Sequence, residues 1–327
     1  MTQSRPDINI ADSTLDSISR AHRFSHDGMA TVFEVIIIHK DACYAQQAAW
    51  AAFDELDKLE QELSRFVENS DISRINNLAA NHPLQIGPAT FECLQLCDSL
   101  YVQTNGAFDI TIGFLMDCWL SEDKTIRTPS REQLKQARQR TGLHLIQLDE
   151  TEHTVQLLTS SVIIDLGGIG KGYAIDQMAK LLGDWGIDTT LINAGCSSVL
   201  ALGSPPGSKG WPLTLSNPSN RKQTLAHLYL RDRAISGSGL QKGRHIIDPR
   251  MARPVEGKSA TWACAPTAAT ADALSTAFMV MSPNQIKQYC LHHPNIQAII
   301  ILQDEGKEPQ GQKILQFGQW KEHELLK

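Results

Sequence analysis

The spacing of apolar residues in this chain changes several times between the period of a strand and the period of a helix. Residues 29–41 are rich in β-branched side chains and predict a strand. Apolar residues recur every three or four positions over residues 45–66 and 91–104 and predict helices there, and the strongly apolar residues 270–281 predict another helix. Strands and helices do not alternate regularly, as they would in βαβ units. We therefore expect an α+β fold with mainly antiparallel sheets and packed helices, not a doubly wound sheet.

Shorter segments complete the expected order of elements. Ser130 and Gln133 have the spacing of a capping box and predict a polar helix over residues 130–140. Residues 69–77 are polar and turn-like, and residues 1–28, which are polar and aperiodic, predict a loose arm. The remaining predictions are a helix over residues 173–185 and strands over residues 143–148, 154–158, 162–166, 189–193 and 298–302.

The balance of charged residues limits the classes of ligand. The 327 residues include 30 Lys and Arg and 36 Asp and Glu, which gives a formal net charge of −6. This weakly acidic balance argues against a general nucleic-acid-binding protein, which usually carries a basic face. A small anionic ligand stays compatible with it, because a few backbone N–H groups and one cation can hold a phosphate locally.

Cysteine usage and the first residues predict the compartment. The seven cysteines are scattered and contain no CxxC pair, so we expect neither a disulfide framework nor a structural zinc site. The first 28 residues hold no apolar run long enough for a secretory signal and no lipid-attachment cysteine. No apolar run approaches the roughly 20 residues that a membrane span needs. We expect a cytoplasmic protein, with prior removal of an export signal as the alternative.

A glycine-rich run follows the strand predicted over residues 162–166. The sequence IIDLGGIGKGYAID, residues 163–176, has four glycines around Lys171. Glycine allows close backbone approach, so successive N–H groups can point at a phosphate, and a helix start and a lysine add positive charge. The spacing matches neither the Walker pattern nor GxGxxG. A phosphate cradle and a tight strand-to-helix turn without a ligand therefore both stay open.

An acid occurs inside the strongly apolar helix predicted over residues 270–281. Asp272 and Thr276 are four positions apart and share one helix face, and Ser275 lies close to that face. Burying a carboxylate there is costly unless a partner compensates its charge. A carboxylate with hydroxyls is an all-oxygen set, which suits magnesium better than zinc. In the alternative, Asp272 serves the positive end of the helix and Thr276 bonds its own backbone.

Two further segments carry polar residues among apolar ones. In GRHIIDP, residues 243–249, His245 opens a short apolar strand and is a candidate general base near neutral pH. In NGAFDIT, residues 105–111, Asp109 and Thr111 alternate, so we expect both on one face of a strand. A structural histidine and an ordinary turn aspartate are the respective alternatives.

The order of these segments resembles the ApbE family, the FAD:protein FMN transferases. The matching stretches are MATVFEV, SRFVENSDISRINN, NGAFDITIG, IIDLGGIGKGYAID, LINAG, AISGSG, HIIDP and APTAATADALSTAFMVM. The resemblance implies a T-fold-like α+β architecture over residues 29–327, built from two halves that are not independent. It also implies magnesium-dependent cleavage of FAD, with FMN passed to a Ser or Thr hydroxyl of a target protein as a phosphoester and AMP released.

The same resemblance implies roles for individual residues. Asp272 and Thr276 match metal ligands, with Ser275 and the Gly168 carbonyl completing the magnesium set. His245 matches the base that activates the acceptor hydroxyl. The positions that match FAD contacts are Met29, Phe66, Ala107, Phe108, Asp109, Asp165, Lys171 and Ile246.

Some segments depart from the residues usual in that family. Residues 193–197 read NAGCS, residues 248–252 read DPRMA, Leu240 replaces an aromatic residue and Phe66 replaces a tyrosine. Two alternatives to the transferase therefore stay open. One is a magnesium-dependent FAD pyrophosphatase that uses water as the acceptor, and the other is a non-catalytic flavin-binding or delivery protein. The expected partners are FAD and an acceptor flavoprotein with a Ser/Thr-containing flavinylation motif, with neither nucleic acid nor a membrane span.

Overall fold

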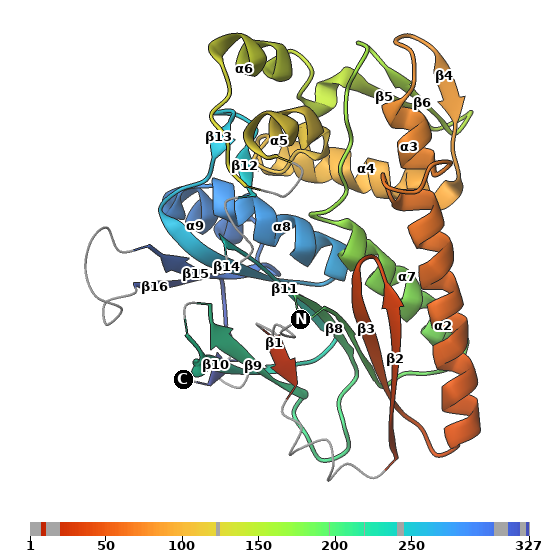
Figure 1. Ribbon diagram of the computed structural model, residues 1–327. Helices are drawn as coiled ribbons and strands as arrows, with labels where there is room; N and C mark the ends of the chain where they lie inside the picture. The colour runs from red at the N-terminus through yellow and green to blue at the C-terminus, as the bar shows by residue number, and fades with distance from the viewer. Residues whose placement is uncertain are drawn as a thin grey trace.

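The computed structural model describes residues 8–10, 20–121, 125–195, 197–218, 220–240, 245–303, 313–320 and 325–326. An antiparallel sheet of eight strands forms its centre (Figure 1). Helices cover one face of this sheet, and a second, smaller sheet covers the other. The strand order of the central sheet is β16 (Ile314–Phe317), β15 (Gln297–Leu302), β14 (Lys258–Ala265), β11 (Arg233–Gly239), β8 (Ser198–Leu202), β7 (Thr190–Ala194), β3 (Thr31–Ile38) and β2 (Ala21–Gly28).

The apolar strands of the central sheet are buried on both faces. In β3, Val35 and Ile37 pack in the main core beneath the helices, whereas Ile36 belongs to the second core between the two sheets. Successive side chains of a strand point to opposite faces, so burial on both sides requires an uninterrupted apolar run such as VIII. The second sheet has the order β1 (Ile8–Ile10), β9 (Trp211–Asn217), β10 (Asn220–Leu230) and β17 (Leu325–Leu326).

Five long helices, together with the short helix Asp71–Asn76, supply the helical side of the main core. In α2, Phe53, Leu56 and Leu59 are buried, but Trp50 lies on the outer flank of the helix and is 57% exposed. The apolar stripe of α2 faces the sheet and α7. The five helices are α2 (Ala42–Leu63), α4 (Pro88–Gln103), α7 (Gly170–Asp184), α8 (Ala268–Val280) and α9 (Pro283–His292).

Smaller elements gather at one end of the molecule, at the top of Figure 1. The loops between them carry several of the candidate site residues. They are α3 (Asp71–Asn76), the 3-10 helices η1 (Ile110–Ile112) and η2 (Leu143–Leu145), α5 (Gly113–Trp119), α6 (Arg131–Arg138), the hairpin of β12 (Ile247–Asp248) with β13 (Arg253–Pro254), and a three-stranded sheet of β4 (Pro83–Gln85), β6 (Thr154–Leu157) and β5 (Ile146–Asp149).

The expected α+β class with mainly antiparallel sheets is confirmed. The capping box of Ser130 and Gln133 is present at the start of α6. The prediction of a loose arm is wrong for residues 21–28, because they form β2 and pair with β3 along its whole length. Residues 1–7 and 11–19 of that arm lie outside the described residues. Within the described part of the chain, no helix has both the length and the apolar character needed to cross a membrane.

Three further predictions of local structure are wrong. Residues 162–166 form no strand, because the side chain of Asn76 accepts from Ile164 N at 2.7 Å and donates to Ile164 O at 3.0 Å in place of a neighbouring strand. The turn expected over residues 69–77 contains α3, whose N-terminus Ser70 caps through Ser73 N. The strand expected over residues 143–148 starts instead as the 3-10 helix η2.

Candidate active site

Helix α8 is anchored to α7 at its N-terminus. The carboxylate of Asp176, in α7, accepts hydrogen bonds from Ala268 N at 2.7 Å and Ala269 N at 2.8 Å. Burial raises the pKa of Asp176 to about 6, although these two hydrogen bonds act in the opposite direction. The two helices touch so closely that a Cβ atom on Gly172 would lie 2.3 Å from Ala268 O. This contact needs a glycine, and it brings the glycine-rich run against α8.

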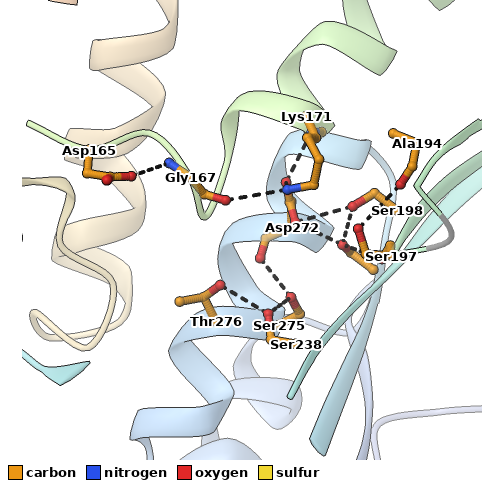
Figure 2. A network of polar contacts seen from close by, with 12 residues as sticks. Asp165, Gly167, Lys171, Ala194, Ser197, Ser198, Ser238, Asp272, Ser275 and Thr276 are labelled. Atoms are coloured by element: carbon orange, nitrogen blue, oxygen red, sulfur yellow. Dashed lines mark hydrogen bonds and ion pairs between the residues drawn. The ribbon is translucent and has the colours of Figure 1, made fainter. Parts of the chain in front are cut away.

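Asp272 is the buried acid on the contact face of α8. Asp272 is 4% exposed, and its carboxylate points toward the start of α7, the first residue of β8 and the middle of β11 (Figure 2). Gly172 N donates to Oδ2 at 3.2 Å, and Lys171 Nζ lies 3.6 Å from the same oxygen. The hydroxyls of Ser198 and Ser236 lie 3.2 and 3.0 Å from Oδ1. One ammonium group and three hydrogen-bond donors therefore compensate the buried charge.

A second group of hydroxyls lies one turn further along α8. Ser238 Oγ is 2.7 Å from Ser275 Oγ and 3.1 Å from Thr276 Oγ1. Ser275 Oγ also donates to Asp272 O at 2.8 Å. A Cβ atom on Gly168 would lie 3.2 Å from Thr276 Oγ1, so the glycine run passes directly over this end of the group. Gly168, which is distant in sequence from α8, thus lies against Thr276 one turn beyond Asp272.

This arrangement does not match the purely structural interpretation of Asp272. The first N–H groups of α8 are bonded by Asp176 and by the N-cap residue Thr267, whose hydroxyl accepts from Thr270 N. Thr276 contacts Ser238 on β11. Asp272 is therefore not the group that satisfies the N-terminus of α8. Its Oδ2 faces Gly172 and Lys171 of the glycine-rich run, and its Oδ1 faces Ser198 and Ser236.

Asp165 organises the bend that leads into α7 (residues 165–171, the glycine bend). Its Oδ1 accepts from Gly167 N at 2.7 Å, and its Oδ2 lies 3.2 Å from Arg65 Nε. Lys171 Nζ donates to Gly167 O at 3.4 Å, which ties the lysine to the same bend. Arg65 also lies over the ring of Phe66, 5.0 Å from its centroid. Phe66 is 84% exposed, which is unusual for a large aromatic side chain in a monomer and leaves a ring face available for stacking.

Asp109 does not lie on a strand, so the expected alternation with Thr111 is wrong. It is the N-cap of η1, and its Oδ1 accepts from Thr111 N at 2.8 Å and from Thr111 Oγ1 at 2.6 Å. A short polar side chain that bonds the backbone two residues on favours a turn over a strand. Burial raises the pKa of Asp109 to about 6, against the opposing effects of the Thr111 bonds and of His144.

The other predicted flavin-contact positions differ in exposure. Ala107, Phe108 and Ile246 are buried. The Phe108 ring lies next to the glycine-rich run, because a Cβ atom on Gly168 would lie 3.4 Å from it. Met29 occupies the turn between β2 and β3, where its φ of 48° is left-handed and its N–H donates to Glu60 Oε2 at 2.8 Å.

His245 is half-buried and stands immediately before Ile246. Gly243 and Arg244 of its motif, and Cys196 of the NAGCS segment, lie outside the described residues.

Comparison with known proteins decides the family. The family model with the description ApbE family matches residues 29–300. The chain belongs to the ApbE family. It is 30% identical over 292 residues to an FAD:protein FMN transferase from Chlamydia trachomatis, covering 84% of this chain and 90% of the relative. A protein of the same name from Klebsiella pneumoniae is 27% identical over 293 residues, covering 85% and 83%.

Solved structures agree with this assignment. The crystal structure of the ApbE protein from Thermotoga maritima superposes with a TM-score of 0.79 at 25% identity, covering 91% of this chain and 97% of that one. The flavinyl transferase ApbE from Pseudomonas stutzeri gives a TM-score of 0.80 at 23% identity, covering 91% and 94%, and supports the fold alone.

Several residues at this ApbE-family site were not predicted from the sequence. Ser198, Ser236, Ser238, Asp176 and Arg65 carry no assigned role in the sequence analysis, yet each contacts a predicted site residue or anchors its helix. Ser236 and Ser238 occur in AISGSG, where serine and glycine alternate at the end of an apolar strand. That alternation is the one local signal that small polar side chains share a strand face there. Ser198 and Arg65 have no comparable signal.

Proposed function

We propose that this protein cleaves FAD and transfers the FMN moiety to the hydroxyl of a serine or threonine on an acceptor protein, with AMP as the second product. The curated relatives named FAD:protein FMN transferase support this reaction. The observation that carries the proposal is the approach of Asp272 to Lys171 at the glycine bend, with Thr276 beside Gly168. An ammonium group and hydroxyls at one helix start suit a diphosphate, and the carboxylate suits a cation that accompanies it.

The oxygen atoms at this place fit a magnesium ion. Among the residues that the structure describes, no three His, Cys, Asp or Glu side chains gather as metal ligands, and Asp272 is the acid that we assign to the site. Magnesium is usually bound by one or two carboxylates together with substrate phosphates, so one acid is sufficient. We propose that Asp272, Ser275, Thr276 and the Gly168 carbonyl hold it. When bound, the ion would offset negative charge on the leaving phosphate.

Lys171 is the proposed phosphate-binding residue of the chain itself, because Gly170 N already donates to Leu166 O and Gly172 N to Asp272. Lys171 Nζ lies between Asp272 Oδ2 and Gly167 O, so it is already held at the bend where the diphosphate would bind. The positive end of α7 adds to its charge. Phosphoryl transfer depends mostly on positioning and charge stabilisation, which these groups supply without changing their protonation.

The flavin end of FAD would be bound by the exposed ring of Phe66. A phenyl ring offers the same stacking face as a tyrosine, and Arg65 holds it through the contact over its other side. Asp165 in turn holds Arg65, so the flavin platform and the glycine bend are mechanically connected. Met29, Asp109 and the neighbouring backbone complete the proposed flavin contacts.

His245 is the proposed general base. In the transfer step, the acceptor oxygen forms a bond to the phosphorus of the FMN moiety and the P–O bond to AMP breaks. The proton of the acceptor hydroxyl passes to an imidazole nitrogen of His245, and AMP leaves with the bridging oxygen. A neutral imidazole suits this role because its pKa lies near neutral pH.

Incubation of the purified protein with FAD and magnesium, with and without a candidate acceptor flavoprotein, tests the proposal. We expect AMP release together with an acceptor whose mass increases by one FMN group, and EDTA should abolish both. His245→Gln should retain FAD binding and lose transfer. AMP release without any adduct would favour the pyrophosphatase alternative, and absence of AMP under all conditions would favour a flavin-binding protein.

A further inference from the structure

A short hairpin follows His245 directly in the chain. Its strands β12 and β13 pair in antiparallel register, Ile247 with Pro254 and Asp248 with Arg253. Val255 N donates to Ile246 O at 3.0 Å, which extends the pairing to the residue next to His245. The path of the backbone that leaves His245 is therefore set by the hairpin.

Two side chains from outside the hairpin bind its turn. Trp119, the last residue of α5, donates from Nε1 to Ala252 O at 2.9 Å. Arg138, the last residue of α6, donates from Nη2 to Met251 O at 2.8 Å. Ala252 has a φ of 52°, a left-handed conformation that is uncommon for a residue with a Cβ atom. External donors on two successive carbonyls help to keep the turn in this conformation.

The hairpin is also packed on both of its faces. Ile247 and Ala252 belong to a small apolar cluster with Leu115 of α5 and Ala137 of α6. On the other side, Ile246 and Val255 pack with Met279 of α8. The hairpin thus lies between the α5–α6 pair and the end of the helix that carries Asp272. A shift of the hairpin toward or away from α8 would move His245 relative to the proposed metal ligands.

We propose that Trp119 and Arg138 are positioning residues that, through the β12–β13 hairpin, hold His245 at a fixed position relative to α8. The inference rests on the proposed role of His245 as the base. Both residues act on backbone carbonyls of the turn, so their effect is on placement and not on FAD binding. A misplacement of about 1 Å in a reacting group costs up to roughly 100-fold in rate, so a loosened hairpin should lower kcat while the KM for FAD changes little.

Trp119→Phe and a matched control test this. Trp211→Phe makes the same chemical change, because Trp211 Nε1 also donates to a backbone carbonyl, Leu202 O at 3.1 Å, but in the second core on the far face of the central sheet. We expect Trp119→Phe to increase hydrogen exchange over residues 245–254 and to lower kcat by roughly tenfold or more, with the KM for FAD within about twofold. Trp211→Phe should lower thermal stability without either change. Arg138→Met, at an exposed side chain, should act in the same direction as Trp119→Phe.

Two results would overturn the inference. One is unchanged exchange over residues 245–254 in both Trp119→Phe and Arg138→Met. The other is an equal loss of kcat in Trp211→Phe, which would mean that general destabilisation explains the effect. His245→Gln separates this inference from the proposed function. If that variant keeps full transfer activity, the base role of His245 fails, and the hairpin contacts are then judged by the exchange data alone.

Discussion

The ammonium group of Lys171 lies 3.6 Å from the carboxylate of Asp272, and this ion pair joins the glycine bend to α8. Lys171 is partly exposed, whereas Asp272 is buried among serine hydroxyls. The lysine therefore neutralises a buried charge and also reaches the open side of the site. The same side chain can contact a phosphate without leaving the bend, because Gly167 O holds it there.

Asp272→Asn should abolish metal-dependent FAD cleavage. The amide oxygen can still accept from Ser198 and Ser236, but the amide NH2 group cannot accept from Gly172 N or attract Lys171, and the charge that a cation needs is lost. We expect activity to fall by roughly 100-fold or more, the scale on which removal of one charge-stabilising group acts, and magnesium binding measured by calorimetry to weaken. Asp184→Asn, on the exposed end of α7, is the control. Full activity of Asp272→Asn at low magnesium would refute its ligand role.

Gly172→Ala should destabilise the protein, although alanine favours helices. The new Cβ atom would lie 2.3 Å from Ala268 O, so α7 and α8 must separate at the site. We expect a loss of about 1–3 kcal/mol in the free energy of unfolding, measured with urea. Gly183→Ala in the same helix meets no atom within 4 Å, and it should instead stabilise by about 0.5–1 kcal/mol. Equal effects of the two substitutions would contradict the close helix contact.

Ala30→Gly should stabilise the turn that presents Met29. Both residues have left-handed backbone conformations, with φ of 48° for Met29 and 59° for Ala30. Glycine adopts this conformation without the steric cost that a Cβ atom brings, so we expect a gain of roughly 0.5–1 kcal/mol in unfolding free energy after the larger unfolded-state entropy is subtracted. Urea denaturation measures it. A loss of stability would mean that the Ala30 methyl group makes contacts that outweigh the backbone strain.

The buried carboxyl of Asp109 should make stability fall as pH rises from about 4 to about 6. Burial raises its pKa in the folded protein to about 6, whereas its unfolded value is near 3.9. The folded state thus binds more protons in this window, and the free energy of unfolding decreases with increasing pH. The effect is on the order of 3 kcal/mol.

Asp109→Asn isolates this contribution, because the amide oxygen can still accept from Thr111 but does not titrate. Thermal unfolding of both proteins between pH 4 and pH 7 gives the comparison. The difference in stability should shift in favour of the variant as pH rises through the window, since the other titrating groups cancel. A constant difference across the window would show that Asp109 does not titrate with a raised pKa.

The fold is predictable from the sequence where the apolar period is regular over several turns. Helices α2 and α4 coincide with predicted helices within a few residues because a buried face dominates the pattern, and α8 does because nearly all of its residues are buried. Residues 162–166 have the composition of a strand, but Asn76 satisfies the backbone of Ile164 from elsewhere in the chain. No local pattern contains that interaction. Helix α9 does have a local signal, the capping box of Ser282 and Gln285, which the apolar period alone does not bring out.

The residues of the candidate site also divide into those that a local sequence pattern reveals and those that only distant contacts bring together. Asp272, Lys171 and the glycines are recognisable because each departs from its surroundings, as an acid in an apolar helix or as glycines between apolar segments. Ser198 and Ser236 are ordinary serines in strands, and they meet only because β8 and β11 are neighbours in the central sheet. Asp176 is an unremarkable acid on a helix until α8 is placed against α7. Such residues become visible when the topology is known.

A crystal structure of the protein with FAD and magnesium tests the central claim most directly. The account predicts density for the diphosphate between Lys171 and the Thr276 side of α8, a metal ion within coordination distance of Asp272, and the flavin ring against Phe66. Diphosphate density away from the glycine bend, with the ion pair between Lys171 and Asp272 undisturbed and no ion beside it, would contradict the account.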